Sequence, residues 1–401
     1  MRPELLSPAG DMERLRMVLH YGADAVYLAG KEFGLRASAG NFDRDGLREA
    51  VALCHKKGVK VHVTVNTLPR EDELPRLPDY LRFLNVLGVD ALIIADLGVL
   101  SLANKYAPEV EKHVSTQLGV VNSETCRVLY EMGASRAVLA RELSLAEIRQ
   151  IRDNAPAGIA LEAFVHGAMC VSFSGRCLLS NYLAGRDANR GECAQPCRWK
   201  YHLVEEKRPD EAFDITEDDG GTYILNSNDL CLIEHLPELM DAGIESFKIE
   251  GRMKSAYYAA VVTNAYRHAI DEAASGLPLS PVWLAELQKL SHRKYCTGFY
   301  FGEPGQYYGK NDTLYFAQAD VCAVVESCDE DGYATLTHRN RFGTGDEVEL
   351  LTNDGEPVRF TAGPMTDEAG EPIPEAIHPM MVFRLRLPRP CAPLSLLRKP
   401  K

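Results

Sequence analysis

Short apolar runs alternate with amphipathic stretches along the first 250 residues of the chain. The apolar runs occupy residues 4–7, 25–29, 60–65, 91–95, 113–116, 136–140 and 159–165. Between them, residues 12–20, 47–57, 78–87, 123–132 and 143–152 have the periodicity of amphipathic helices. Strands that are apolar throughout and separated by helices indicate a parallel sheet that is covered on both faces.

Seven strand–helix units precede residue 166, and a candidate eighth strand at residues 246–250 follows a predicted helix at 232–242. The spacing of about 25–35 residues is that of repeated βα units. We therefore predict an α/β fold of the TIM type, a (β/α)8 barrel that is regular or distorted. An open doubly wound sheet is the alternative arrangement.

Two regions depart from this alternation. Residues 166–231 include a long cysteine-rich insertion between the seventh and eighth strands, where barrel enzymes place their chemistry. After residue 315 the pattern changes to short strands at 317–326, 333–336, 347–351, 358–361 and 381–387, separated by polar turns. We predict a barrel domain at residues 1–315 and a small β-barrel-like domain at 316–401.

The composition is ordinary for a globular enzyme, with 46% hydrophobic and 25% charged residues in a chain of 401. The net charge of −13 argues against a surface that binds nucleic acid nonspecifically. Residues 166–200 are the exception, because five basic side chains stand there against two acidic ones. The chain shows neither a signal peptide nor an apolar run of the roughly 18–20 residues that span a bilayer. We expect a cytoplasmic protein without membrane contact.

Five of the eleven cysteines are clustered within 62 residues. They are Cys170, Cys177, Cys193, Cys197 and Cys231, separated by six, 15, three and 33 residues. Structural disulfides are rare in the reducing cytosol, so this clustering indicates a metal site or a catalytic role. Zinc sites usually contain CxxC or HxxxH pairs, which this segment lacks, whereas iron–sulfur clusters accept wider spacings. Spacing alone leaves an iron–sulfur cluster, zinc and ordinary buried cysteines open.

Several segments together strongly resemble the peptidase U32 family, the collagenase-like peptidases. The motifs are LSPAGD at 6–11, GADAVY at 22–27, EAFVHGAMCVSFSGRC at 162–177, ANRGECAQPCRW at 188–199, NSNDL at 226–230 and KIEGR at 248–252. The segments YCTGF at 295–299 and NRF at 340–342 fit the family as well. The motifs follow the family's order over nearly the whole chain, which makes the resemblance highly specific.

The resemblance implies a TIM-type barrel that holds a 4Fe–4S cluster and takes part in oxygen-independent hydroxylation. Some relatives form 5-hydroxyuridine at the tRNA wobble position and need prephenate, and others act on ribosomal RNA or ubiquinone precursors. The relatives' four-cysteine set matches Cys170, Cys177, Cys193 and Cys231. A divergent subgroup uses a CxxxC pair, which Cys197 completes here, so the identity of the fourth ligand stays open. The length and the β domain are closest to the tRNA-hydroxylation subgroup.

Three residues near the predicted site are candidates for catalysis. Glu162 and His166 share a face with Phe164 by strand alternation, and His166 suits a proton donor or a substrate contact. If that face is the barrel lumen, Glu162 is a buried carboxylate that needs a partner, either as part of the site or in a structural ion pair. Glu250 marks the end of the eighth strand beside Lys248, where barrel residues tend to be functional.

Basic and amide side chains are candidates for substrate binding. Arg176, Arg190 and Arg198 suit carboxylates and phosphates, because the guanidinium fork binds both in bidentate fashion. Arg252 lies after the eighth strand and Asn66 after the third. For each arginine of the insertion, a solvated salt bridge is the ordinary alternative. The expected partners are tRNA or another RNA, and a small acidic molecule such as prephenate.

Hydrolytic motifs are missing from the sequence, which contains neither HExxH nor GxSxG. A nucleophile built from Cys170 and His166 would leave the other clustered cysteines unexplained, whereas a cluster explains four of them. We therefore favour an iron–sulfur protein that hydroxylates RNA, with the tRNA wobble uridine as the expected substrate. A peptidase and a non-catalytic RNA-binding or assembly factor are the alternatives, and the oligomeric state stays open.

Overall fold

The computed structural model describes residues 2–35, 40–170, 172–175, 177–199, 216–218, 221–223, 227–302 and 318–401. The barrel strands are β1 (Glu4–Pro8), β2 (Ala25–Ala29), β3 (Lys60–Val65), β4 (Ala91–Ile94), β5 (Glu111–Val114), β6 (Arg136–Val138), β7 (Ala160–Ala168) and β11 (Ser246–Ile249). The helices around them are α1 (Met12–His20), α2 (Arg44–Lys56), α3 (Leu77–Leu87), α4 (Leu97–Tyr106), α5 (Ser123–Glu131), α6 (Leu145–Asn154), α8 (Leu236–Asp241), α9 (Ala256–Ala274) and α10 (Pro281–Gln288).

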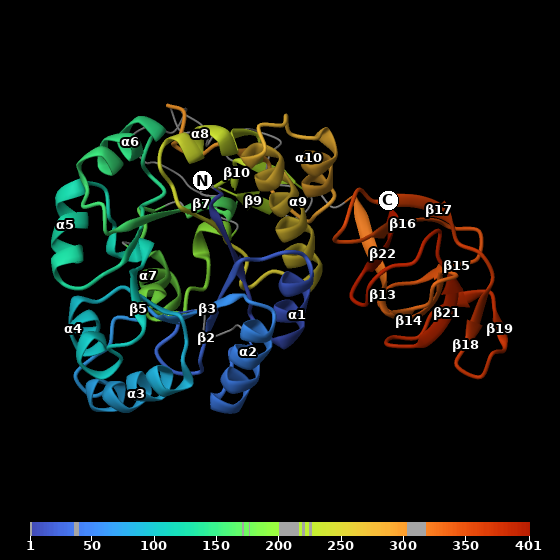
Figure 1. Cartoon of the computed structure of the whole chain (residues 1–401), viewed down its shortest axis with the longest axis horizontal. Helices are drawn as coiled ribbons and strands as arrows, with labels where there is room; N and C mark the ends of the chain where they lie inside the picture. The colour runs from blue at the N-terminus through green and yellow to red at the C-terminus, as the bar shows by residue number, and fades with distance from the viewer. Residues whose placement is uncertain are drawn as a thin grey trace.

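The eight strands close into a parallel barrel. Each strand pairs with the next along the chain from β1 to β7, and β11 then pairs in parallel with both β7 and β1. In the closing register, Glu4 lies opposite Ser246, which lies opposite Glu162. Figure 1 shows the helices as a ring outside the strands. The predicted barrel is confirmed, and the open doubly wound sheet is wrong.

Apolar burial and helix caps explain why these elements form where they do. Every residue of β2 and β4 is buried, as expected for strands covered by helices outside and by side chains in the lumen. Asp11 caps α1, and Ser144 caps α6 in a capping box with Glu147. None of the helices in the described residues is long and apolar enough to cross a membrane.

The insertion between β7 and β11 adds short elements above the barrel. They are α7 (Leu179–Ala184), the 3-10 turns η3 (Ala188–Arg190) and η4 (Pro196–Arg198), and the strands β8 (Thr216–Asp218), β9 (Gly221–Tyr223) and β10 (Asp229–Cys231). Strand β10 runs antiparallel to the end of β7, and β12 (Tyr295–Cys296) pairs with β10. Further 3-10 turns are η1 (Leu74–Arg76), η2 (Thr116–Leu118) and η5 (Ile233–His235).

The C-terminal region is all-β and antiparallel. Its strands are β13 (Ala319–Cys328), β14 (Tyr333–His338), β15 (Phe342–Gly343), β16 (Glu347–Leu351), β17 (Val358–Thr361), β18 (Met365–Asp367), β19 (Pro372–Ile373), β20 (Glu375–Ala376), β21 (Val382–Arg386) and β22 (Leu396–Pro400). The main sheet has the order β17-β16-β22-β13-β14-β21-β18-β19 and packs around its own apolar cluster. It lies beside α1, α9 and α10 (Figure 1).

Candidate functional site

A cavity of about 170 Å³ lies at the carboxyl ends of the barrel strands. The strand ends contribute Thr64, Asn66, Ser115, Phe164, Lys248, Glu250 and Arg252 to its wall. The insertion contributes Cys170, Cys177, Cys193 and Cys197. This end of a TIM-type barrel is where catalytic residues from different strands meet, so the cavity is the candidate active site.

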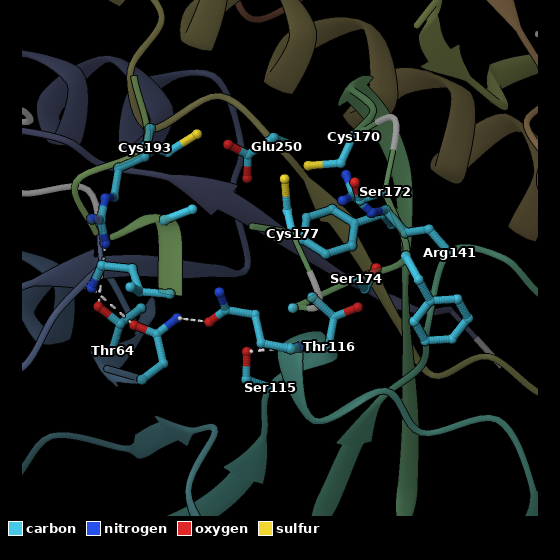
Figure 2. Close-up of a pocket in the computed structure, with 18 of the residues that line it drawn as sticks. Thr64, Ser115, Thr116, Arg141, Cys170, Ser172, Ser174, Cys177, Cys193 and Glu250 are labelled. Atoms are coloured by element: carbon cyan, nitrogen blue, oxygen red, sulfur yellow. Dashed lines mark hydrogen bonds between the residues drawn. The ribbon is translucent and has the colours of Figure 1, made fainter. Parts of the chain in front are cut away.

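Four of the five clustered cysteines share this pocket. Figure 2 shows Cys170, Cys177 and Cys193 around the carboxylate of Glu250. Cys170 is exposed, and Cys177, Cys193 and Cys197 are half-buried. Four of the cysteines that the sequence singles out thus line one pocket, and their role as metal ligands stays a prediction.

The chemistry of these side chains fits a metal site. Thiolates are the ligands that both zinc and iron–sulfur clusters take. The four thiols at the pocket would hold such a group, and the kind of metal site stays a prediction.

Cys231, the fourth ligand in the predicted set, lies elsewhere. It is on β10 opposite His166, and its Sγ accepts a hydrogen bond from the Tyr266 hydroxyl at 3.9 Å. Burial raises the pKa of this thiol to about 12. The structure thus brings three of the four predicted ligands to one pocket and adds Cys197. Cys231 as a ligand stays a prediction.

The predicted face of His166 is wrong because β7 contains a bulge. Lys248 pairs with Phe164 but Ile249 pairs with His166, so Val165 has no counterpart on β11. The extra residue turns the His166 ring out of the lumen, against Tyr258, Tyr266 and Tyr295. Burial lowers its pKa to about 3. The ring does not line the pocket, and a catalytic role for it stays a prediction.

Glu162 does face the lumen, as the alternation predicts. Its carboxylate is fully buried and accepts hydrogen bonds from Lys248 at 2.8 Å, Arg136 at 3.0 Å and the Ser246 hydroxyl at 3.1 Å. Burial by itself raises its pKa, but Lys248 and Arg136 outweigh burial and lower the pKa to about 2. Glu162 therefore reaches the pocket only through Lys248, which lines it.

Two buried histidines surround the same carboxylate. His62, His113 and Glu162 place one possible ligand atom each within 4.8 Å of the others. A cation at that point would compete with Lys248 and Arg136, which already hold both carboxylate oxygens. The lumen is therefore an ion-pair network in place of the bulky branched side chains that usually fill such barrels.

Three other predicted residues do line the pocket. Asn66 accepts a hydrogen bond from the Leu35 amide at 3.1 Å and donates to Gln117 at 3.3 Å. Arg252 is buried and donates to the Thr64 hydroxyl at 3.2 Å. Glu250 accepts a hydrogen bond from the Tyr27 hydroxyl at 3.3 Å.

Glycine at one position allows Glu250 to approach the end of β7. Gly167 has a φ of +111°, and a Cβ there would lie 2.4 Å from the carbonyl oxygen of Glu250. Any other residue would be strained and would clash with that backbone. This close approach of the Glu250 backbone explains why the residue after His166 is a glycine.

The arginines of the insertion do not share one position. Arg190 forms a bidentate pair with Glu73, at 2.7 and 2.9 Å, and does not line the pocket. This is the salt bridge that the sequence allowed as the ordinary alternative. Arg176 and the side chain of Arg198 lie outside the described residues, so their predicted roles stay predictions.

Sequence reasoning missed Arg141, Gln117 and Tyr27 on the pocket wall. Arg141 had a usable signal, because it directly follows the predicted sixth strand, just as Asn66 follows the third. Gln117 and Tyr27 had none, since a glutamine in a 3-10 turn and a tyrosine in an apolar strand resemble many ordinary residues.

Comparison with known proteins agrees with this architecture. Residues 10–310 match peptidase family U32, and residues 317–398 match the peptidase family U32 C-terminal domain. The chain is 39% identical to tRNA hydroxylation protein P1 of Bacillus subtilis (strain 168), over 100% of this chain and 95% of that protein.

Two further relatives carry different names. An uncharacterized protease of Methanocaldococcus jannaschii is 46% identical over 87% of this chain and 86% of its own length. A 23S rRNA 5-hydroxycytidine synthase of Escherichia coli (strain K12) is 40% identical over 67% of this chain and 39% of its own length. With both family matches in chain order and relatives this similar, the chain belongs to peptidase family U32.

Proposed function

We propose that this protein is an RNA-modifying hydroxylase that holds a 4Fe–4S cluster at the pocket and acts on the wobble uridine of tRNA with prephenate as co-substrate. The observation that carries the proposal is the meeting of four thiols and the polar strand ends at one cavity. Two similar proteins are named for RNA hydroxylation, and the one named for tRNA aligns with the whole chain.

The proposed cluster ligands are Cys170, Cys177 and Cys193, with Cys197 or Cys231 as the fourth. The resemblance to other U32 proteins supports Cys231. Placement supports Cys197, because its thiol lines the same pocket as the other three. When bound, an iron–sulfur cluster supplies redox or Lewis-acid chemistry that no amino-acid side chain offers.

The chain's own residues would bind and orient the substrate. Tyr27 offers an aromatic face of the kind on which a base turned out of its stack packs. Asn66 and Gln117 are hydrogen-bonded to each other and present amide groups to the edge of such a base. A wobble uridine suits this pocket because loop bases are readily splayed out of the RNA.

The peptidase alternative lacks geometric support. A Cys–His nucleophile needs the two side chains within hydrogen-bonding reach. Cys170 lines the pocket, whereas the His166 ring packs among tyrosines outside the lumen, with its Nδ1 3.4 Å from the Tyr266 hydroxyl. The family's name and the relative named as a protease therefore have no counterpart in a Cys170–His166 catalytic pair of this protein.

A non-catalytic RNA-binding factor is the third alternative. Such a protein needs a basic face but no concave site. The concave pocket at the catalytic end of the barrel favours an enzyme.

Nucleoside analysis of tRNA tests the proposed activity. A strain that lacks this protein should lose 5-hydroxyuridine and its derivatives from tRNA, as measured by mass spectrometry, and the wild-type gene should restore them. Cys170→Ala should fail to restore them, whereas Cys328→Ala, a half-buried thiol of the C-terminal region, should succeed. Unchanged nucleosides in the deletion strain would sink the proposal.

Metal analysis tests the cluster and its fourth ligand. Anaerobically purified protein should be brown and contain about four irons and four sulfides per chain. Iron content should fall in whichever of Cys197→Ala and Cys231→Ala removes a ligand, and it should stay normal in the other. Colourless anaerobic protein with one zinc per chain would contradict the cluster.

Purified protein should also fail to cleave casein or collagen. Peptidase activity that persists through purification and disappears in Cys170→Ser, with iron absent from both proteins, would instead favour the hydrolase.

A further inference from the structure

Two buried cations line the pocket in addition to the residues that sequence reasoning selected. Arg141 follows β6 and is 8% exposed, and Lys248 lies on β11 and is 4% exposed. Arg141 is seen beside Ser174 in Figure 2. Buried arginine and lysine side chains are rare unless each is paired, so the partners of both decide what they do here.

Arg141 has hydrogen-bonding capacity that the protein does not use. One Nη donates to the carbonyl oxygen of Ala168 at 3.0 Å, and the guanidinium is also hydrogen-bonded to the Cys170 sulfur. Its Nε is buried, and the described part of the chain gives that atom no hydrogen-bond partner. Leaving a buried charged donor unpaired costs free energy, so such a group at a cavity wall indicates a place for a ligand acceptor.

The Lys248 ammonium is held by Glu162 in the barrel lumen, and the side chain also lines the cavity. Its ammonium donates to Glu162 at 2.8 Å, which is its one hydrogen-bond partner among the described residues. An ammonium group has three donors. The nitrogen lies 4.7 Å from the Tyr27 ring centroid and 5.4 Å from that of Phe164, so aromatic faces cover it where no oxygen does.

The two cations face one cavity. Arg141 and Lys248 both line it, and each lies 5.4 Å from the centroid of the Phe164 ring, which lines it as well. A guanidinium and an ammonium with unused donors favour a carboxylate, which accepts charge-assisted hydrogen bonds from both. A neutral nucleobase would not compensate for burying these cations.

We propose that Arg141 and Lys248 form a subsite that binds a carboxylate of a small organic acid against the Phe164 ring. The cavity of about 170 Å³ is far larger than the roughly 10–15 Å³ that one water molecule needs, so it has room for a small acid with an apolar ring. Glu162, itself held by Arg136, keeps the Lys248 ammonium in place. The subsite deepens the proposed function, on which it rests, by naming the residues that select the acidic co-substrate.

Calorimetric titration with phenylpyruvate tests the subsite, because this probe combines a carboxylate with an apolar ring. The full chain, purified anaerobically and without RNA, should bind phenylpyruvate and should not release it when uridine is added. Arg141→Gln and Lys248→Met should each weaken binding at least tenfold. Lys248→Arg should recover most of the affinity, because it restores a cation over the same ring.

A matched control separates this effect from a general change in charge. Arg127→Gln removes a cation from the exposed surface of α5, where it pairs with Glu124 and Glu131, and should leave binding unchanged. Affinity in Arg141→Gln that equals this control would overturn the subsite even if Lys248→Met fails to fold. Displacement of phenylpyruvate by uridine would overturn it as well.

The binding experiment tests the subsite independently of the proposed tRNA activity. Binding of the acid is measured without RNA, whereas the hydroxylation is read from tRNA nucleosides. Unchanged nucleosides in the deletion strain with normal acid binding would end the proposed tRNA activity and leave the subsite. Loss of the modified nucleosides from the deletion strain, together with acid binding that is unchanged in Arg141→Gln and Lys248→Met, would support the tRNA activity and overturn the subsite.

Discussion

Two buried ionic networks of matched composition lie in different parts of this protein. In the barrel lumen, Lys248 and Arg136 neutralise Glu162 and Glu4 through N···O distances of 2.5–3.0 Å. All four side chains come from barrel strands, and Glu162 at their centre is fully buried. One end of this network, Lys248, lines the pocket.

The second network joins the barrel to the C-terminal region. Arg398 of β22 is fully buried and pairs with Glu286 of α10 at 2.6 Å and with Glu349 of β16 at 2.8 Å. Lys289 lies 2.8 Å from both carboxylates. This network also contains two cations and two anions, but its members come from two parts of the fold and none lines the pocket.

The comparison shows that position, and not pairing, decides what a buried ion pair does. In both networks the carboxylate at the centre has a pKa of about 2, because its cations outweigh a burial that would raise it. At the interface this attraction fixes two structural units to each other. In the lumen it fixes a cation beneath a cavity, where that cation stays available to a ligand.

The largest effect is expected from removing the cation that joins the two units. Arg398→Met leaves Glu286 and Glu349 buried with Lys289 and the exposed Arg359 to balance them, and breaking a buried pair from one side costs about 3–5 kcal/mol. The free energy of unfolding should fall by that amount in urea titrations. Fluorescence of Trp283, which is buried in α10, should report the loss at the interface.

Arg359→Met is the matched control for that change. Arg359 pairs with the same Glu349 at 3.2 Å, but its side chain is 64% exposed. An exposed pair contributes about 0–1 kcal/mol, so this variant should stay close to the wild type. Equal losses in the two variants would show that burial does not set the strength of the interface.

A smaller loss is expected in the lumen, because Arg136 keeps a second partner in Glu4. Glu162→Gln should cost about 3 kcal/mol, mainly because Lys248 loses its carboxylate. Adding Lys248→Met should recover part of that loss, because no buried ammonium then remains unpaired. A double-mutant cycle in urea measures the coupling. Additive losses would mean that the two side chains do not stabilise each other.

Much of the barrel follows from local pattern. Strands β2 and β3 coincide with the predicted ranges 25–29 and 60–65, because a strand buried on both faces needs a continuous apolar run. Helix α9 was not predicted. Its residues from Tyr258 to Arg267 are all buried, so it lacks the polar face that reveals a surface helix.

The site was predictable to the extent that it depends on strand ends and cysteine spacing. Asn66, Glu250 and Arg252 reach the pocket because parallel strands end at the same rim. The direction of His166 was not predictable, since it depends on a one-residue register shift between β7 and β11 that no residue type marks. The position of Cys231 depends on the antiparallel return of β10, which is a long-range pairing.

Acid should affect the ion-pair network of the lumen before that of the interface. Burial, together with His113, Arg136, Lys248 and Lys60, lowers the pKa of His62 well below 6.5. The unfolded chain therefore takes up this proton first, and stability falls as the pH drops below about 6.5, by roughly 1.4 kcal/mol per pH unit.

Urea titrations at several pH values check this order. His62→Gln should lose less stability than the wild type between pH 6.5 and 5, and the same amount between pH 8 and 7. Glu162 and Glu349 have pKa values of about 2, so their contribution is lost only between about pH 4.5 and 2, in both networks. Parallel curves for His62→Gln and the wild type would contradict the assignment.

The smallest change in the free energy of unfolding is expected at a helix cap outside both networks. It gives a reference against which the losses in the networks can be compared. Ser144 accepts a hydrogen bond from the Glu147 amide at 3.3 Å, and the Glu147 carboxylate accepts one from the Ser144 amide at 2.7 Å. Ser144→Ala should lower the free energy of unfolding by about 1 kcal/mol, and Ser144→Asp should keep most of it, because aspartate also caps a helix. Urea unfolding measures both variants. If Ser144→Ala cost as much as Glu162→Gln, the lumen network would stabilise the barrel no more than one exposed cap, and its remaining role would be to hold Lys248 at the pocket.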